Sequence, residues 1–157
     1  MSQPRDADTE QSDGETASIL DEMVLRAVDK APVGLTISGP PEDDVPLIYA
    51  NEAFTRLTGY RERDVIGRNC RFLQCEDTAA EPLRELREAI DAGKGASVEL
   101  LNYRKDGAEF WNQVKIAPLR DENGTVTNYV GFQQDITERK RKQAQLRRQS
   151  EQFERFG

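Results

Sequence analysis

The chain has 157 residues and a formal net charge of −7, which suits one domain with tails and disfavours general binding to nucleic acids. It has no histidine and two cysteines, Cys70 and Cys75, which excludes histidine-dependent catalytic sites and a zinc site with four of its own Cys or His ligands. It also lacks an apolar run long enough to cross a membrane, and its N-terminus has no signal-peptide pattern. We therefore expect a cytoplasmic protein without membrane contact.

The N-terminal part divides into a polar segment and a helix. Residues 1–16 are acidic, with almost no apolar side chains, and we expect them to be disordered. Apolar residues then recur with helical spacing from Ile19 to Val28. This pattern predicts a flanking helix over residues 17–31, which ends before Pro32.

Short elements follow in the middle of the chain. The patterns predict strands over residues 33–38 and 46–50, helices over 52–57 and 61–66, and a longer helix over 78–92. Asn51 is the expected N-terminal cap of the first of these helices, and Gly59 is expected to end it.

The last part of the core reads as a three-stranded meander. Strands are predicted over residues 97–103, 108–119 and 126–136. The Asp106-Gly107 and Asn123-Gly124 pairs between them are typical of hairpin turns. Two strands, several short helices and a meander predict an α+β fold.

The alternation of side chains along the meander places amides where apolar residues are expected. Asn102 shares a strand face with Val98 and Leu100, Asn112 shares one with Val114 and Ile116, and Gln133 shares one with Tyr129 and Gly131. A single amide of this kind more often bonds to backbone. Three amides on one inner face favour a polar ligand, because a buried amide without partners costs about 1–3 kcal/mol. Gly131 would allow a flat ligand to approach the sheet.

The opposite face of the meander is apolar as well. Leu101, Trp111, Val130 and Phe132 are predicted to lie there. A sheet that is apolar on both faces needs a second cover. We expect flanking helices or a second subunit to supply it.

The segment Gly67-Arg68-Asn69-Cys70-Arg71-Phe72-Leu73-Gln74 resembles the signature of photoactive LOV (light-oxygen-voltage) domains of the PAS superfamily. Further segments of the chain follow in family order: NEAF, LTGY, LREAI, LLNYRKDGAEFWNQ and YVGFQQDIT. The resemblance covers residues 32–137. It implies a five-stranded antiparallel sheet with short helices on one face and a helix at each end.

The resemblance also implies a flavin mononucleotide (FMN) cofactor and roles for individual residues. Cys70 would bond flavin carbon C4a after blue light, and Gln133 would face O4 and N5 and rotate its amide as the switch. Arg71 and Arg87 would bind the phosphate, which favours FMN over riboflavin. The other residues expected at the cofactor are Thr36, Ser38, Asn51, Asn69, Leu73, Gln74, Asn102, Asn112, Val114, Ile116 and Gly131.

The sequence departs from the family at a few positions. Cys75 stands where the family usually has glycine, and we interpret it as structural. Thr36 stands where the family often has valine, and Ser38 where it often has threonine. We expect the Cys70 thiol to be neutral, because there is no histidine to deprotonate it and its surroundings should be apolar.

The C-terminal residues 138–157 are charged and favour a helix. They resemble the linker that joins a PAS or LOV domain to a sensor histidine kinase, so the chain is either a fragment of a larger receptor or a short stand-alone LOV protein. We predict a photosensory module that is not itself an enzyme, forms a homodimer through the outer sheet face and flanking helices, and signals to an output domain such as a histidine kinase. The alternatives are a flavoenzyme and a light-indifferent, flavin-binding PAS module for redox sensing or interaction.

Overall fold

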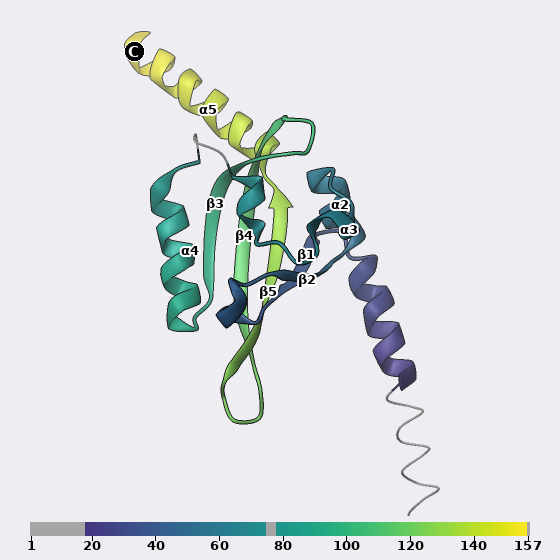
Figure 1. Ribbon diagram of the computed structural model, residues 1–157. Coiled ribbons are helices and arrows are strands. Elements are labelled where there is room, and N and C mark those ends of the chain that lie inside the picture. Colours follow the sequence, from purple (N-terminus) through teal and green to yellow (C-terminus); the bar gives the residue numbers. More distant parts are fainter. Residues whose placement is uncertain (1–17, 75–77, 157) are drawn as a thin grey trace, which may run out of the picture.

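Five strands form one antiparallel sheet in the order β2-β1-β5-β4-β3 (Figure 1). The computed structural model describes residues 18–74 and 78–156, with side chains as far as Glu154. The strands are β1 (Gly34–Ser38), β2 (Leu47–Ala50), β3 (Ala96–Tyr103), β4 (Glu109–Arg120) and β5 (Val126–Asp135). The predicted α+β fold with a five-stranded antiparallel sheet is confirmed.

Short helices and one longer helix lie beside the sheet, and two flanking helices extend away from it (Figure 1). They are the N-terminal helix (residues 18–29), η1 (Pro41–Asp43), α2 (Glu52–Thr58), α3 (Glu62–Val65), η2 (Cys70–Leu73), α4 (Ala80–Ala92) and α5 (Thr137–Phe156). The predicted helices are present, with boundaries that differ by a few residues. The predictions for residues 1–16 and for Cys75 lie outside the described residues.

The entrance to α2 shows how the sequence sets an element boundary. The Asn51 side chain accepts a hydrogen bond from the backbone N–H of Phe54 at 3.0 Å, which satisfies one of the free donors of the first turn. At the other end, Gly59 has a φ of +78° and donates its N–H to Thr55 O at 2.8 Å. A left-handed residue of this kind ends a helix most easily when it is glycine. Both predictions are confirmed.

The inner face of the meander carries both apolar side chains and amides. Val98, Leu100, Phe110 and Tyr129 are buried there. The strand register sets Leu100 opposite Asn112 and Val114 opposite Gln133, so the amides lie among these apolar residues. The inward direction that the alternation predicts for the three amides is confirmed, since all are at most 5% exposed.

The outer face of the sheet is only partly covered by the described residues. The first turns of α5 cover Trp111, with Lys140 Nζ 4.7 Å from the centre of the indole ring. Phe132 on β5 stays 39% exposed. None of the described helices is both long enough and apolar enough to span a lipid bilayer.

Candidate cofactor site

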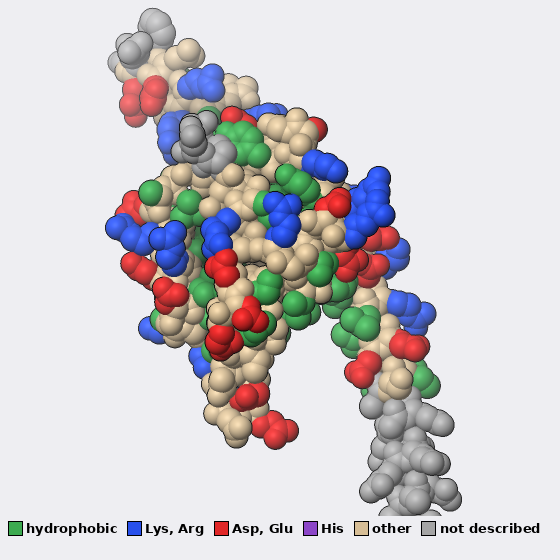
Figure 2. Space-filling view, in the orientation of Figure 1, with side chains coloured by type: hydrophobic (Ala, Val, Ile, Leu, Met, Phe, Trp, Pro, Cys, Tyr) green, Lys and Arg blue, Asp and Glu red, His purple; other side chains and the backbone are tan. Residues whose placement is uncertain are grey.

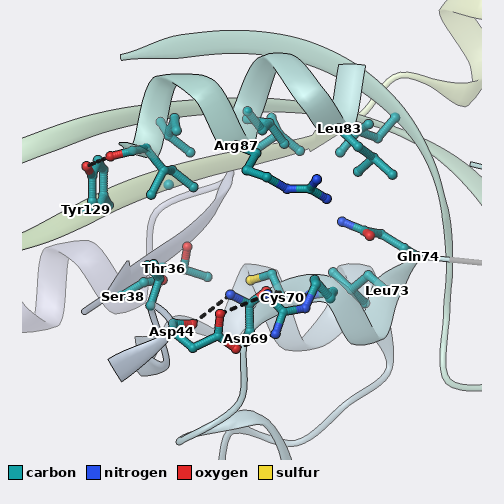
Figure 3. A pocket seen from close by; sticks show the side chains of 18 of the residues that line it. Thr36, Ser38, Asp44, Asn69, Cys70, Leu73, Gln74, Leu83, Arg87 and Tyr129 are labelled. Atoms are coloured by element: carbon teal, nitrogen blue, oxygen red, sulfur yellow. Dashed lines mark hydrogen bonds and ion pairs between the residues drawn. The ribbon is translucent and has the colours of Figure 1, made fainter. Parts of the chain in front are cut away.

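A cavity of about 630 Å³ lies between the inner face of the sheet and the elements η1, η2 and α4 (Figure 3). Its volume is within the range of sites for drug-sized ligands and cofactors. All but one of the predicted site residues line it. They are Thr36, Ser38, Asn69, Cys70, Arg71, Leu73, Gln74, Arg87, Asn102, Asn112, Val114, Ile116, Gly131 and Gln133.

Asn51 is the exception, and its predicted place at the cofactor is a correction. Its amide is fully buried and already uses its hydrogen-bonding groups elsewhere. The Oδ1 atom accepts from the backbone N–H groups of Leu35 and Phe54, and Nδ2 donates to the carbonyls of Val28 and Val33, all at 2.9–3.0 Å. Asn51 therefore joins the end of the N-terminal helix, β1 and α2, and does not line the cavity.

Replacing Asn51 with alanine is expected to lower the free energy of unfolding by about 3 kcal/mol, because the change leaves buried backbone groups without partners. Urea unfolding followed by circular dichroism would measure this loss. Gln145→Ala, at an exposed site on α5, is the control and should leave the midpoint unchanged. An Asn51→Ala protein as stable as the natural chain would contradict the structural role.

The three inner amides leave two oxygen atoms unpaired at the cavity. Asn112 Nδ2 donates to Asn102 Oδ1 at 3.0 Å, and Gln133 Nε2 donates to Thr36 Oγ1 at 3.1 Å. Asn112 Oδ1 and Gln133 Oε1 are buried and have no partner among the described residues. A buried acceptor without a donor is unfavourable, so these two oxygens favour a ligand with N–H groups on its edge. The pyrimidine ring of a flavin carries an N–H group of this kind, so the residues that line the cavity fit a flavin.

Gly131 is required where β1 and β5 meet behind these amides. It is paired with Thr36 in the strand register. A Cβ atom at this position would lie 2.6 Å from Thr36 Oγ1 and 2.9 Å from Gln133 Nε2. The hydrogen bond between Thr36 and Gln133 therefore occupies the space in which any other residue would place its side chain.

Cys70 begins the short helix η2 and is set on the opposite wall of the cavity from the sheet (Figure 3). Its half-buried side chain packs against the cluster of Leu47, Phe54, Val65 and Leu73. Burial raises the pKa of the Cys70 thiol to about 12. Desolvation disfavours the charged thiolate and is the cause of this shift. The thiol is therefore neutral near pH 7, and a neutral thiol is a poor nucleophile.

The mouth of the cavity is charged. Arg71 pairs with Asp44: Nη1 donates to Oδ1 at 3.0 Å, and Nη2 pairs with Oδ2. The hydrogen bond and the charge of Arg71 lower the pKa of the Asp44 carboxyl. Arg87 of α4 and Gln74 point toward one another across the opening (Figure 3).

Several lining residues were not among the predicted site residues. They include the apolar Leu83, Leu86 and Ile90 of α4, the aromatic Tyr129, and the acidic Glu42, Asp44 and Asp91. The leucines and Ile90 are spaced by three and four residues, and this helical pattern could have revealed their shared face. Tyr129 Oη donates to Ile90 O at 2.6 Å, which fastens the end of α4 to β5. No sequence pattern pointed to the acidic residues.

Comparisons with known proteins agree with this geometry. Residues 32–138 match the PAS domain family. The LOV domain from the Erythrobacter litoralis blue-light activated histidine kinase superposes with a TM-score of 0.66 at 42% identity, over 69% of this chain and 99% of that chain. The chain belongs to the PAS family and is a LOV domain.

Two curated relatives of this LOV domain are larger proteins. Blue-light-activated histidine kinase 1 of Erythrobacter litoralis is 46% identical over 116 residues, which are 74% of this chain and 32% of that protein. The bacterioopsin transcriptional activator of Halobacterium salinarum is 44% identical over 131 residues, which are 83% of this chain and 19% of that protein. The LOV domain thus spans less than a third of either relative.

Proposed function

We propose that this LOV domain senses blue light through FMN held in the cavity, with Cys70 as the residue that reacts. The observation that carries the proposal is the combination of a half-buried, neutral thiol on one wall with two unpaired amide oxygens on the other. When bound, FMN would supply an excited ring whose carbon C4a takes the thiol sulfur while its nitrogen N5 takes the thiol proton. The thiol needs no general base for this step, which suits a protein without histidine.

The other residues would bind and orient the ring. Asn102 and Asn112 would hydrogen-bond its pyrimidine edge, with Leu73, Val114 and Ile116 packing against its faces. Asn69 and Gln74 would bond the ribityl chain, while Arg71 and Arg87 would hold the phosphate. Ser38 and Thr36 line the wall formed by β1.

Gln133 would act as the switch. Its amide offers a donor and an acceptor. When nitrogen N5 of the ring becomes protonated, rotation of the amide would exchange the two groups. Thr36 could support either orientation, since a hydroxyl both donates and accepts. The rotation would alter bonding in β5, two residues before Asp135.

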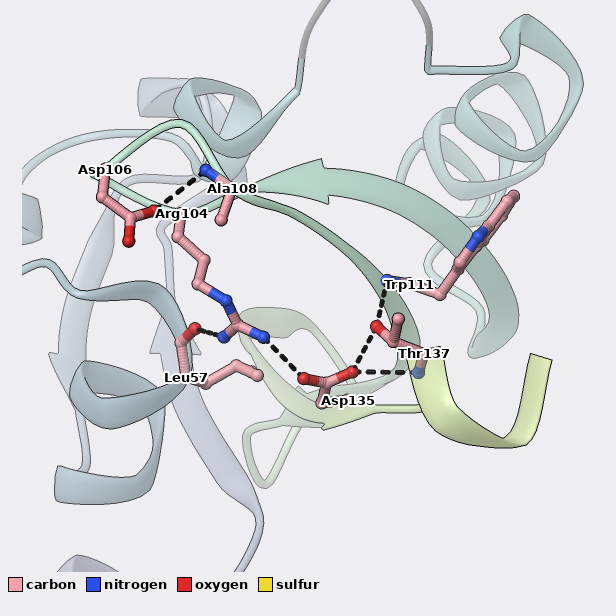
Figure 4. Close-up of polar contacts among 7 residues, drawn as sticks. All are labelled: Leu57, Arg104, Asp106, Ala108, Trp111, Asp135 and Thr137. Carbon is pink, nitrogen blue, oxygen red and sulfur yellow. Dashed lines mark hydrogen bonds and ion pairs between the residues drawn. The ribbon is translucent and has the colours of Figure 1, made fainter. Parts of the chain in front are cut away.

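Asp135 connects β5 to the flanking helix α5 (Figure 4). It accepts hydrogen bonds from Thr137 N at 2.9 Å and from Arg104 Nη2 at 2.7 Å. Thr137 Oγ1 in turn accepts from Trp111 N at 2.9 Å. Burial alone would raise the pKa of the Asp135 carboxyl, but its bonds to Thr137 and Arg104 lower it on balance. We infer that a signal passes through this carboxylate to α5 and to an output domain such as a histidine kinase.

An absorption spectrum before and after blue light tests the photoreceptor function. A structured blue band that bleaches to a near-ultraviolet species and returns in the dark is the expected result. A flavin band that never bleaches would instead support a light-indifferent PAS module. Absence of a flavin band after addition of FMN would contradict flavin binding altogether.

We further propose that the chain forms a homodimer through its exposed apolar surfaces. Hydrophobic side chains stand on the surface of the N-terminal helix (Figure 2), where Ile19, Met23 and Val24 are 51–59% exposed. Phe132 is exposed on the outer sheet face. A second copy that covers these residues would bury an apolar area unusual for a free surface.

A Met23→Glu/Val24→Glu double variant is expected to be monomeric at concentrations where the natural chain is dimeric. Light scattering across micromolar concentrations would measure the mass. Arg26→Gln changes a neighbouring exposed charge and should leave the dimer intact. A natural chain that is monomeric throughout would refute the dimer.

A further inference from the structure

The guanidinium of Arg71 is already occupied at the mouth of the cavity. Both of its terminal nitrogens pair with the carboxylate oxygens of Asp44, in the two-pronged arrangement that arginine also uses toward phosphate. Asp44 and Arg71 both line the cavity. A ligand phosphate that reached Arg71 would therefore meet a carboxylate in the same place.

The segment that carries Asp44 is held in position toward Arg71. Asn69 Nδ2 donates to Asp44 O at 2.8 Å, and Asn69 Oδ1 accepts from Arg71 N at 3.0 Å. Asp44 and Val45 have φ angles of +69° and +49°, a left-handed conformation that is unfavourable for a β-branched residue such as valine. One asparagine thus fastens both partners of the ion pair, and the backbone adopts a rare conformation at that point.

The surrounding charges do not favour an anion. Glu42, Asp44 and Asp91 line the cavity, together with two arginines, Arg71 and Arg87. Arg87 is exposed and forms no ion pair with any other described residue, which leaves it open to a phosphate. Arg71 would first have to break its ion pair with Asp44.

We propose that Asp44 is a specificity-determining residue, a carboxylate that competes with the ligand phosphate for Arg71. This inference rests on the proposed binding of FMN. When FMN binds, the phosphate replaces Asp44 on the guanidinium, so part of the phosphate's attraction is offset by the ion pair that is lost. Specificity is a difference between two binding affinities. Asp44 makes the affinity for FMN less different from the affinity for riboflavin, which has no phosphate.

Titration of the full flavin-free chain with FMN and with riboflavin, followed by flavin fluorescence, tests the proposal. Asp44→Asn should tighten FMN binding about fivefold, the upper range for an exposed ion pair, and should leave riboflavin binding unchanged. The ratio of the two affinities within one variant corrects for any loss of folded protein. Asp44→Ser removes the carboxylate in a second way and should shift the ratio in the same direction.

Two further variants complete the design. Asp43→Asn removes the neighbouring carboxylate, which does not line the cavity, and should not change the ratio. In an Arg71→Gln background, Asp44→Asn should lose its advantage, because no guanidinium remains to compete for.

An unchanged ratio, or weaker FMN binding in both Asp44 variants, would overturn the competition and mark Asp44 as a residue that positions Arg71. In that case the proposed function stands, because the natural chain still binds flavin. A natural chain that binds neither flavin would overturn the proposed function and this inference together.

Discussion

A Cys70→Ala protein should bind flavin with its blue absorption band intact and show no bleaching after blue light. The cavity keeps its amides, its apolar walls and its arginines in this variant, so the cofactor should stay. Only the sulfur that forms the new bond is missing. The effect is complete loss of the photoproduct, measured as the absorbance change after a flash.

Cys75→Ala is the matched control for this experiment, since it removes the other cysteine of the chain. This control should bleach and recover like the natural protein. Normal bleaching by Cys70→Ala, or its loss in Cys75→Ala alone, would show that the proposed thiol is the wrong one.

The raised pKa of Cys70 adds a pH test to the same measurement. With a folded-state pKa of about 12, against an ordinary value of 9.0, the thiol stays protonated in the folded chain at neutral and mildly alkaline pH. The extent of bleaching should therefore not change between about pH 6 and about pH 9 through titration of this group. Above its ordinary pKa the unfolded chain releases the proton first, so this group lowers stability as the pH rises from 9.0 toward about 12. A sigmoidal change in bleaching near pH 8 would contradict the neutral thiol.

A double variant, Asn102→Leu/Asn112→Leu, should bind FMN at least about a hundredfold more weakly, a loss of about 3 kcal/mol. The two amides bond to each other, so replacing both removes their mutual hydrogen bond and the unpaired Asn112 Oδ1 together. Leucines of similar size should leave the flavin-free fold as stable as before, or more stable. The polar edge of the ring would then be buried without partners.

Binding and stability are measured separately for this variant, by flavin titration and by urea unfolding of the flavin-free chain. Gln113→Leu is the control. Gln113 lies next to Asn112 on β4, but its side chain is on the other face of the sheet, so this variant should bind FMN normally. Weaker folding together with weaker binding would mean that the amides serve the fold, and unchanged binding would mean that they do not contact the ligand.

Much of the site could be predicted because its residues follow short, regular patterns. The period of two along a strand directs Asn102, Asn112 and Gln133 inward, and the GRNCRFLQ segment carries Cys70 with its neighbours. These patterns lie within single elements. They need no knowledge of which elements meet.

The remaining features depend on contacts between distant parts of the chain. Asp44 meets Arg71 across 27 residues, and Asp44 and Val45 adopt left-handed conformations there, which no residue preference predicts. Asn51 forms its hydrogen bonds with groups from separate segments of the chain. The sequence does not show these contacts, so Asn51 was predicted to bind the ligand. The helices η1 and η2 are too short to show a hydrophobic period.

The helix α5 gives this domain the geometry of a lever. Under the proposed function its pivot would be the Asp135–Thr137 junction, and its described side chains from Arg141 to Glu154 are all exposed to solvent. Its 20 residues make an arm about 30 Å long. A tilt of about 5° at the pivot would move the far end by about 2.5 Å, more than half the spacing between neighbouring strands. Under the proposed function, a small change in the hydrogen bonds of β5 would be enlarged into a displacement that a helix of the proposed second subunit could follow.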